Sequence, residues 1–147
     1  MPDEERTGPA TAARIVHVAL YVDDLDRSCS FYEEHFGARC GPLYHSARTS
    51  GFSSRFLTLP GGGPRLELMH LPPLETPRAG IGYAHIAMGL GARADVDAVV
   101  ARLAGAGVTV ASAPRLTGDG YYEAVVLDPD GNPIEITTTG SPHTEVP

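Results

Sequence analysis

Two histidines and two glutamates occupy matching places in the two halves of this sequence. His17 stands in the tetrapeptide VHVA and His85 in the near copy AHIA. Glu67 lies between two leucines and Glu135 between two isoleucines, and the spacing is the same, because 85 − 17 and 135 − 67 both equal 68. Two imidazoles and two carboxylates suit one divalent ion such as Ni²⁺, Co²⁺, Zn²⁺, Fe²⁺ or Mn²⁺, and an open coordination position permits Lewis-acid catalysis. We therefore predict that these four residues bind one metal ion.

The apolar neighbours of the two glutamates indicate how the chain would present them. Side chains alternate between the two faces of a β-strand. Leu66 and Leu68 would then pack into the core while Glu67 points to the opposite face, and the isoleucines around Glu135 repeat the pattern. If the halves pair with pseudo-twofold symmetry, the four ligands converge.

The order of predicted elements also repeats. The first half predicts a strand, a helix and three further strands, at 15–22, 25–36, 38–44, 52–59 and 65–71, and Asp23-Asp24 and Gly37 supply the helix cap and stop. The second half predicts the same order at 83–90, a helix that follows Asp95 and ends at 105–107, then 108–113, 121–127 and 134–139. The apolar stripe of the second helix aligns Leu25 with Val96, three residues away from the common offset, which predicts a small compensated insertion there.

One domain of ordinary size accounts for the length of 147 residues. We predict a flexible arm at 1–13, a single domain at 14–139 made of modules 14–71 and 82–139 with a linker at 72–81, and a tail at 140–147. The proline and glycine content of the stretch between the modules is typical of a linker.

Composition excludes several classes of partner. The net charge of −7, with every basic residue an arginine, argues against nucleic acid or an anionic membrane as the main partner. No segment reaches the length of a membrane span, and the acidic N-terminus is not expected to be a signal peptide. Cys29 and Cys40 lack a metal-type spacing and are expected to be reduced thiols in a cytoplasmic protein, with a disulfide as the alternative.

These residues resemble the vicinal oxygen chelate superfamily, which includes glyoxalase I, methylmalonyl-CoA epimerase, extradiol dioxygenases and fosfomycin-resistance proteins. The resemblance covers about residues 14–139, and its strongest piece is DPDGNPIE, which ends at Glu135. It implies an α+β fold of two βαβββ modules, whose paired, curled, mixed sheets form a cup around the metal. It also implies a small-molecule substrate and a homodimer, often with the active site across the subunit interface.

The set of ligands resembles bacterial-type glyoxalase I, which has His, Glu, His, Glu at these positions. The resemblance implies a metal-dependent lyase or isomerase that acts through an enediolate on a small carbonyl compound, such as the adduct of a 2-oxoaldehyde with a thiol. Glu135 is the first candidate for the base that moves the proton, and Glu67 the second. Neither the substrate, the thiol, the metal, nor whether one chain or two supply the ligands follows from the sequence.

Two other functions remain open. One is an epimerase similar to methylmalonyl-CoA epimerase, which usually carries Gln where this chain has Glu67. The other is a resistance protein that binds a small molecule in the same cup, a class that usually lacks the metal ligands.

The sequence departs from glyoxalase I where that family holds glutathione. An Arg four residues after the first His and an Asn four residues after the first Glu are replaced by Tyr21 and Leu71. Other arginines would have to hold an anionic substrate, and the candidates are Arg48, Arg55 and Arg115. The remaining histidines, at 35, 45, 70 and 143, have no symmetric partners and are expected at the surface, with the side chain of residue 70 facing away from the site.

Overall fold

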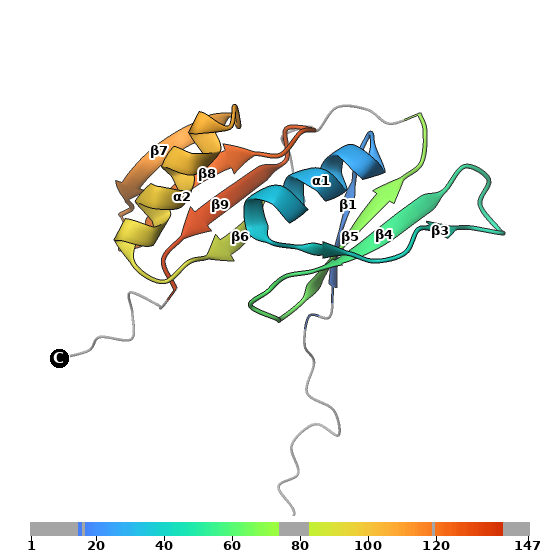
Figure 1. Ribbon diagram of the computed structural model, residues 1–147, viewed down its shortest axis with the longest axis horizontal. Helices are drawn as coiled ribbons and strands as arrows, with labels where there is room; N and C mark the ends of the chain where they lie inside the picture. Colours follow the sequence, from blue (N-terminus) through green and yellow to red (C-terminus); the bar gives the residue numbers. More distant parts are fainter. Residues whose placement is uncertain (1–14, 16, 74–82, 119, 140–147) are drawn as a thin grey trace, which may run out of the picture.

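The chain folds into two βαβββ modules, each a mixed sheet with one helix packed on it (Figure 1). The computed structural model describes residue 15 and residues 17–73, 83–118 and 120–139. The first module contains β1 (His17–Tyr21), α1 (Leu25–Phe36), β2 (Arg39–Cys40), β3 (Tyr44–His45), β4 (Ser53–Thr58) and β5 (Arg65–His70). The second contains β6 (Ile86–Gly89), α2 (Arg93–Gly105), β7 (Val110–Leu116), β8 (Tyr122–Leu127) and β9 (Pro133–Thr137). The predicted α+β class is confirmed, whereas the predicted arm, tail and most of the linker lie outside the described residues.

Each sheet is built in the same order. The first runs β1-β5-β4-β2, with β3 also paired to β4, and the second runs β6-β9-β8-β7. The first and last strands of each module are parallel neighbours, and the other pairs are antiparallel. The register repeats as well, because Ala19 pairs with Glu67 and Ala87 with Glu135. The internal duplication therefore extends to the pairing of individual residues.

The helices keep the common offset, so the predicted insertion is wrong. α1 begins at Leu25 and α2 at Arg93, which are 68 positions apart. Val96 is buried at the position equivalent to Ser28, and both are fully enclosed. Alignment by apolar residues misses this match because the buried residue of α1 is a serine. Asp95 also lies inside α2, where its carboxylate accepts a hydrogen bond from the Ala92 amide at 2.9 Å.

The predicted strand at 38–44 is divided into β2 and β3. Pro42 lies between them and has no N–H to donate to β4, so the ladder is interrupted there. The last bond before the break runs from the Gly41 amide to the Phe56 carbonyl, at 2.7 Å. The first predicted strand of the second module is likewise shorter than expected and begins at Ile86.

Alternation along the strands separates a core face from a second face in each sheet. Leu57, Leu66 and Leu68 are buried on the core face of the first sheet, and Ile134 and Ile136 on that of the second. The buried apolar side chains of both modules form one cluster. The opposite face, which carries the residues at 17, 67, 85 and 135, is called the cup face below.

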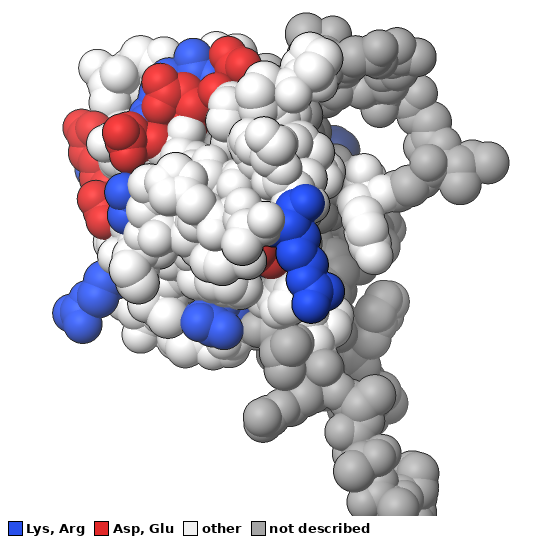
Figure 2. Space-filling model, turned by 90° about the vertical axis from the view of Figure 1, so that its right-hand side faces the viewer, with Lys and Arg blue, Asp and Glu red and all other residues white. Residues whose placement is uncertain are grey.

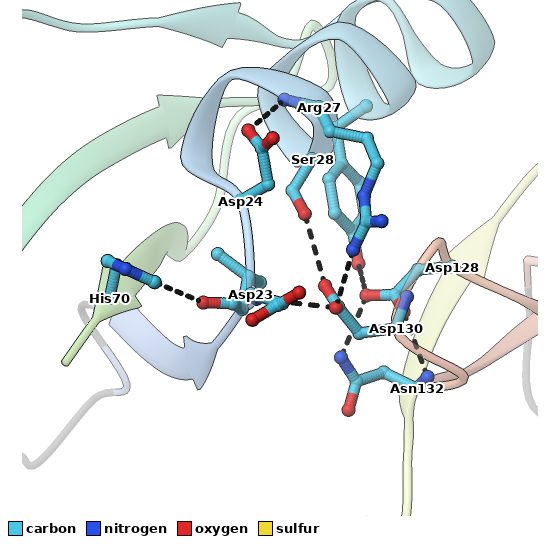
Figure 3. A network of polar contacts seen from close by, with 10 residues as sticks. Asp23, Asp24, Arg27, Ser28, His70, Asp128, Asp130 and Asn132 are labelled. Carbon is cyan, nitrogen blue, oxygen red and sulfur yellow. Dashed lines mark hydrogen bonds and ion pairs between the residues drawn. The ribbon is translucent and has the colours of Figure 1, made fainter. Parts of the chain in front are cut away.

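A polar network joins α1 of the first module to the hairpin turn of the second (Figure 3). Tyr32 is fully buried, and its hydroxyl donates to Asp128 Oδ2 at 3.0 Å. Arg27 Nη2 donates to Asp130 Oδ1 at 2.8 Å, and Ser28 Oγ donates to Asp130 Oδ2 at 3.3 Å. The amides of residues 130 and 132 and the Asn132 side chain donate to the Asp128 carboxylate, which explains how a buried carboxylate is tolerated. The network fixes one module against the other.

The pKa of the Tyr32 hydroxyl gives this contact a measurable pH dependence. Burial, followed by the nearby Asp128 carboxylate, raises the pKa of Tyr32 above its ordinary value of 10.0. The contribution of Tyr32 to stability is therefore complete below pH 10 and is lost as the pH rises further, because only the unfolded chain ionises readily.

We expect Tyr32→Phe to lower the free energy of unfolding by about 1–3 kcal/mol at neutral pH and to weaken the fall in stability above pH 10. Urea unfolding at both pH values measures this, with the exposed Tyr83→Phe as control; equal alkaline sensitivity of both variants would contradict it.

One histidine expected at the surface is buried instead, and a second is half-buried. His35 is buried on α1, where its ring contacts Phe31, and its Nδ1 has no hydrogen-bond partner among the described residues. His70 is half-buried and its Nδ1 lies 3.0 Å from the Val22 carbonyl oxygen, on the side away from Glu67 as predicted. His45 is exposed, and His143 lies outside the described residues.

Candidate metal and substrate site

The four predicted ligands lie on the cup faces as two separate pairs. His17 begins β1, Glu67 lies on the adjacent β5, and their Nε2 and Oε2 atoms are 3.6 Å apart. His85 directly precedes β6, Glu135 lies on the adjacent β9, and the equivalent atoms are 3.1 Å apart. The parallel register sets Ala19 opposite Glu67 and Ala87 opposite Glu135. Each histidine lies two residues before that alanine, on the same face, and so lies close to the glutamate.

One chain does not gather all four residues around a common point. Within residues 17–73, 83–118 and 120–139, no three of the His, Cys, Asp and Glu side chains group closely enough to hold a metal ion. Each module instead presents one imidazole and one carboxylate. The predicted convergence of four ligands therefore does not occur within the described part of a single chain.

Each pair has the chemistry of half a metal site. The histidine side chains are 42% and 46% exposed, and the glutamates are 16% and 19% exposed, so all four remain accessible from the cup face. Imidazole nitrogen and carboxylate oxygen are both ligands of divalent transition metals. The donor types and their proximity fit such an ion, and two half-sites brought together would supply two nitrogens and two oxygens.

A hollow of about 570 Å³ opens on the cup face of the first sheet beside Glu67. This volume lies within the usual range of small-molecule sites. The strands supply most of its lining, with Arg39 from β2, Tyr44 from β3, Ser54, Phe56 and Thr58 from β4, and Arg65 and Glu67 from β5. The candidate metal ligand Glu67 is thus part of the wall of a substrate-sized pocket.

Phe56 connects the histidine to the hollow. Its ring meets the His17 ring edge-on, with centroids 5.5 Å apart. The Arg65 guanidinium lies over the same ring, 4.3 Å from its centroid, in a cation–π contact. The metal pair and the pocket therefore share one aromatic residue.

None of the three arginines predicted to hold an anionic substrate lines this hollow. Arg48, Arg55 and Arg115 are absent from its lining, and Arg55 instead donates to the Gly41 carbonyl at 2.9 Å. The arginines that do line it are Arg39 and Arg65. Arg65 could have been found, because it lies two residues before Glu67 and shares its face. Arg39 could not, because only the pairing of β2 with β4 brings it there.

Charged side chains of both signs lie on this side of the molecule. Figure 2 views the molecule from the right-hand side of Figure 1, where the first module lies, and shows acidic side chains gathered at the upper left. Arginine side chains are spread over the same view, some in its lower half and some beside the acidic group. This acidic chain therefore still presents several arginines on this side.

One of the two cysteines, Cys40, also lines the hollow. Both carry free thiols. Burial raises the pKa of the Cys29 thiol, and burial followed by the contact with Cys29 raises that of Cys40. Both therefore stay protonated at neutral pH, which makes them poor nucleophiles and poor metal ligands. The expectation of reduced thiols agrees with their free state.

No helix in the described ranges is long and apolar enough to cross a membrane.

Comparison with known proteins places these features in one family. Residues 14–136 match the Glyoxalase/Bleomycin resistance protein/Dioxygenase superfamily. The chain is 34% identical over 125 residues to the lactoylglutathione lyase of Haemophilus influenzae, covering 83% of this chain and 90% of that protein. It is also 34% identical over 127 residues to an uncharacterised protein of Pseudomonas aeruginosa, covering 84% of this chain and 86% of that one.

Solved structures agree. The trypanothione-dependent glyoxalase I of Leishmania major superposes with a TM-score of 0.69 at 28% identity, covering 86% of this chain and 87% of that one. A second relative from Frankia, described as a domain of the same superfamily, superposes with a TM-score of 0.73 at 23% identity, covering 87% and 98%. The chain therefore belongs to the Glyoxalase/Bleomycin resistance protein/Dioxygenase superfamily.

Proposed function

We propose that this protein is a metal-dependent, glyoxalase I-like lyase or isomerase that acts on a small carbonyl compound through an enediolate. The observation that carries the proposal is the pair of equivalent half-sites, His17 with Glu67 and His85 with Glu135, on cup faces that repeat in register. The similarity to a lactoylglutathione lyase over most of both chains supports the same reaction class.

A second copy of the chain would complete each site. A twofold axis that brings the first module of one copy against the second module of the other forms two identical sites, each with two histidines and two glutamates. Exposed apolar side chains favour such a contact, among them Tyr21 on the cup face of β1 and Leu43 and Tyr44 beside the hollow. The proposed protein is thus a homodimer, and its free thiols fit the reducing cytoplasm.

The four ligands would have distinct tasks. His17 and His85 would bind the cation as neutral imidazoles, with Glu67 and Glu135 as carboxylate ligands. A divalent cation bound there would supply Lewis-acid stabilisation to two neighbouring oxygens of the substrate. Glu135 would take the proton from the carbon next to the carbonyl and return it to the adjacent carbon, with Glu67 as the second candidate. A carboxylate that moves a proton must be within hydrogen-bonding reach of it, and the proposal is supported by the accessibility of Glu135, whose side chain is 19% exposed.

Turnover assays with several thiols test the proposal. Methylglyoxal is mixed with glutathione, with trypanothione or with simple thiols, and isomerisation of each adduct is followed with protein stripped by a chelator and then reloaded with Ni²⁺, Co²⁺ or Zn²⁺. We expect turnover of at least one adduct, lost on chelation and restored by metal. Turnover of methylmalonyl-CoA alone would instead assign the epimerase function, and high-affinity binding without turnover or metal would assign a resistance protein.

A further inference from the structure

The proposed reaction leaves the two arginines of the hollow without a role. Arg39 and Arg65 both line it, and neither has an ion pair with any residue that the structure describes. Arg27 and Arg55, in contrast, have acidic neighbours, since Arg27 pairs with Asp130 and Arg55 lies 3.8 Å from Asp26. In a chain of net charge −7, two unpaired guanidinium groups in one pocket point to an anionic ligand.

Strand pairing places the two guanidinium groups in one row across the sheet. Arg39 pairs with Thr58, and Arg65 pairs with His17 on its other side. Leu57 pairs with Leu66, so the next residues in the register, Thr58 and Arg65, also face each other. Two strand spacings of roughly 4.8 Å then separate the α-carbons of Arg39 and Arg65 by about 10 Å. Arginine side chains are long enough to converge on one small anion from that separation.

Arg65 contacts an aromatic neighbour. Its Cζ atom lies over the Phe56 ring, 4.3 Å from the centroid. A guanidinium in a cation–π contact can still donate through its N–H groups, and their fork matches the two oxygens of a carboxylate. The contact with Phe56 also restricts the Arg65 side chain before a ligand binds, so that binding removes less of its conformational freedom.

We propose that Arg39 and Arg65 bind a carboxylate of the substrate close to its reacting carbons. Arg65 and Glu67 share one face of β5 and lie two residues, about 7 Å, apart. An anion held by Arg65 is therefore only a few bonds from oxygens bound beside Glu67. The inference rests on the proposed function and narrows it to compact, carboxylate-bearing substrates.

Binding of a carboxylate in the absence of metal tests the arginines independently of turnover. Calorimetry on metal-stripped dimer at constant ionic strength compares glutarate with glutaramide, its neutral isostere. We expect glutarate to bind and glutaramide to bind far more weakly, and Arg39→Ala and Arg65→Ala each to weaken glutarate binding about 10- to 100-fold. Arg65→Lys keeps the charge but loses the fork, so it should recover only part of the loss.

The matched control is Arg48→Ala, which removes an exposed arginine outside the hollow. It should leave glutarate binding unchanged. An equal loss in Arg48→Ala, or no loss in either pocket variant that retains the wild-type circular dichroism and thermal unfolding, would overturn the inference.

Turnover separates this inference from the proposed function. Adducts of methylglyoxal with 3-mercaptopropionate and with 2-mercaptoethanol differ in one carboxylate. We expect a higher kcat/KM for the carboxylated adduct, and a ratio near one in Arg65→Ala. Turnover with the same ratio in wild type and variant would overturn the inference while the proposed function stands. Arginine-dependent glutarate binding without turnover of any adduct would support the carboxylate site but contradict the proposed function.

Discussion

Replacement of Glu135 by glutamine should reduce turnover by about 10²- to 10⁴-fold, the usual contribution of a general base, while most of the bound metal is retained. The amide oxygen of glutamine can still bind a cation, but it cannot take a proton. kcat measured together with metal content by elemental analysis separates the two effects.

Glu67→Gln is the matched control because Glu67 occupies the equivalent place in the first module. We expect it to lower turnover less than Glu135→Gln at the same metal content. Undiminished activity of Glu135→Gln on a confirmed substrate would show that Glu135 is not the base. A larger loss of activity in Glu67→Gln would instead assign the base to Glu67.

Mixing two inactive variants should restore activity if two chains share each site. His17→Ala damages the first module's half-site and His85→Ala the second's, so each variant alone should lose at least about 10²-fold in metal affinity and turnover. In a dimer that contains one chain of each variant, one site combines both defects and the other combines both intact half-sites. Random exchange of subunits in an equal mixture then predicts about a quarter of wild-type turnover.

Subunit exchange is promoted by partial denaturation and refolding of the mixture, and each variant treated alone is the control. Recovery in the mixture only is the expected result. A mixture as inactive as its components, although sizing and mass spectrometry demonstrate mixed dimers, would place all four ligands of a site within one chain.

Much of the fold could be predicted because the same sequence pattern occurs in both halves of the chain. The equal spacing of the two His and the two Glu, together with alternating apolar residues, led to two βαβββ modules, and the strand register repeats the same offset. Alignment of the two helices by their apolar residues failed where a buried position is occupied by a polar side chain. Ser28 occupies the place of Val96 because it packs beside the Asp130 carboxylate, and no hydrophobic pattern indicates that.

The rest of the site depends on contacts between strands that are distant in the sequence. Arg39 enters the hollow through the pairing of β2 with β4, and the Tyr32–Asp128 hydrogen bond joins two modules. Whether four ligands meet depends on how modules are placed against one another, within a chain or between chains. A local pattern identifies each His–Glu pair but contains no information on that placement.

The central claim is that two chains jointly bind the metal, and metal content as a function of oligomeric state tests it most directly. Chelator-stripped protein is loaded with Ni²⁺ or Zn²⁺ and separated by size, and metal and protein are quantified across the peaks. The account predicts one ion per chain in the dimer and little in any monomer. A monomer that retains a full equivalent of metal, or a dimer that remains empty after loading with excess divalent ion, would contradict it.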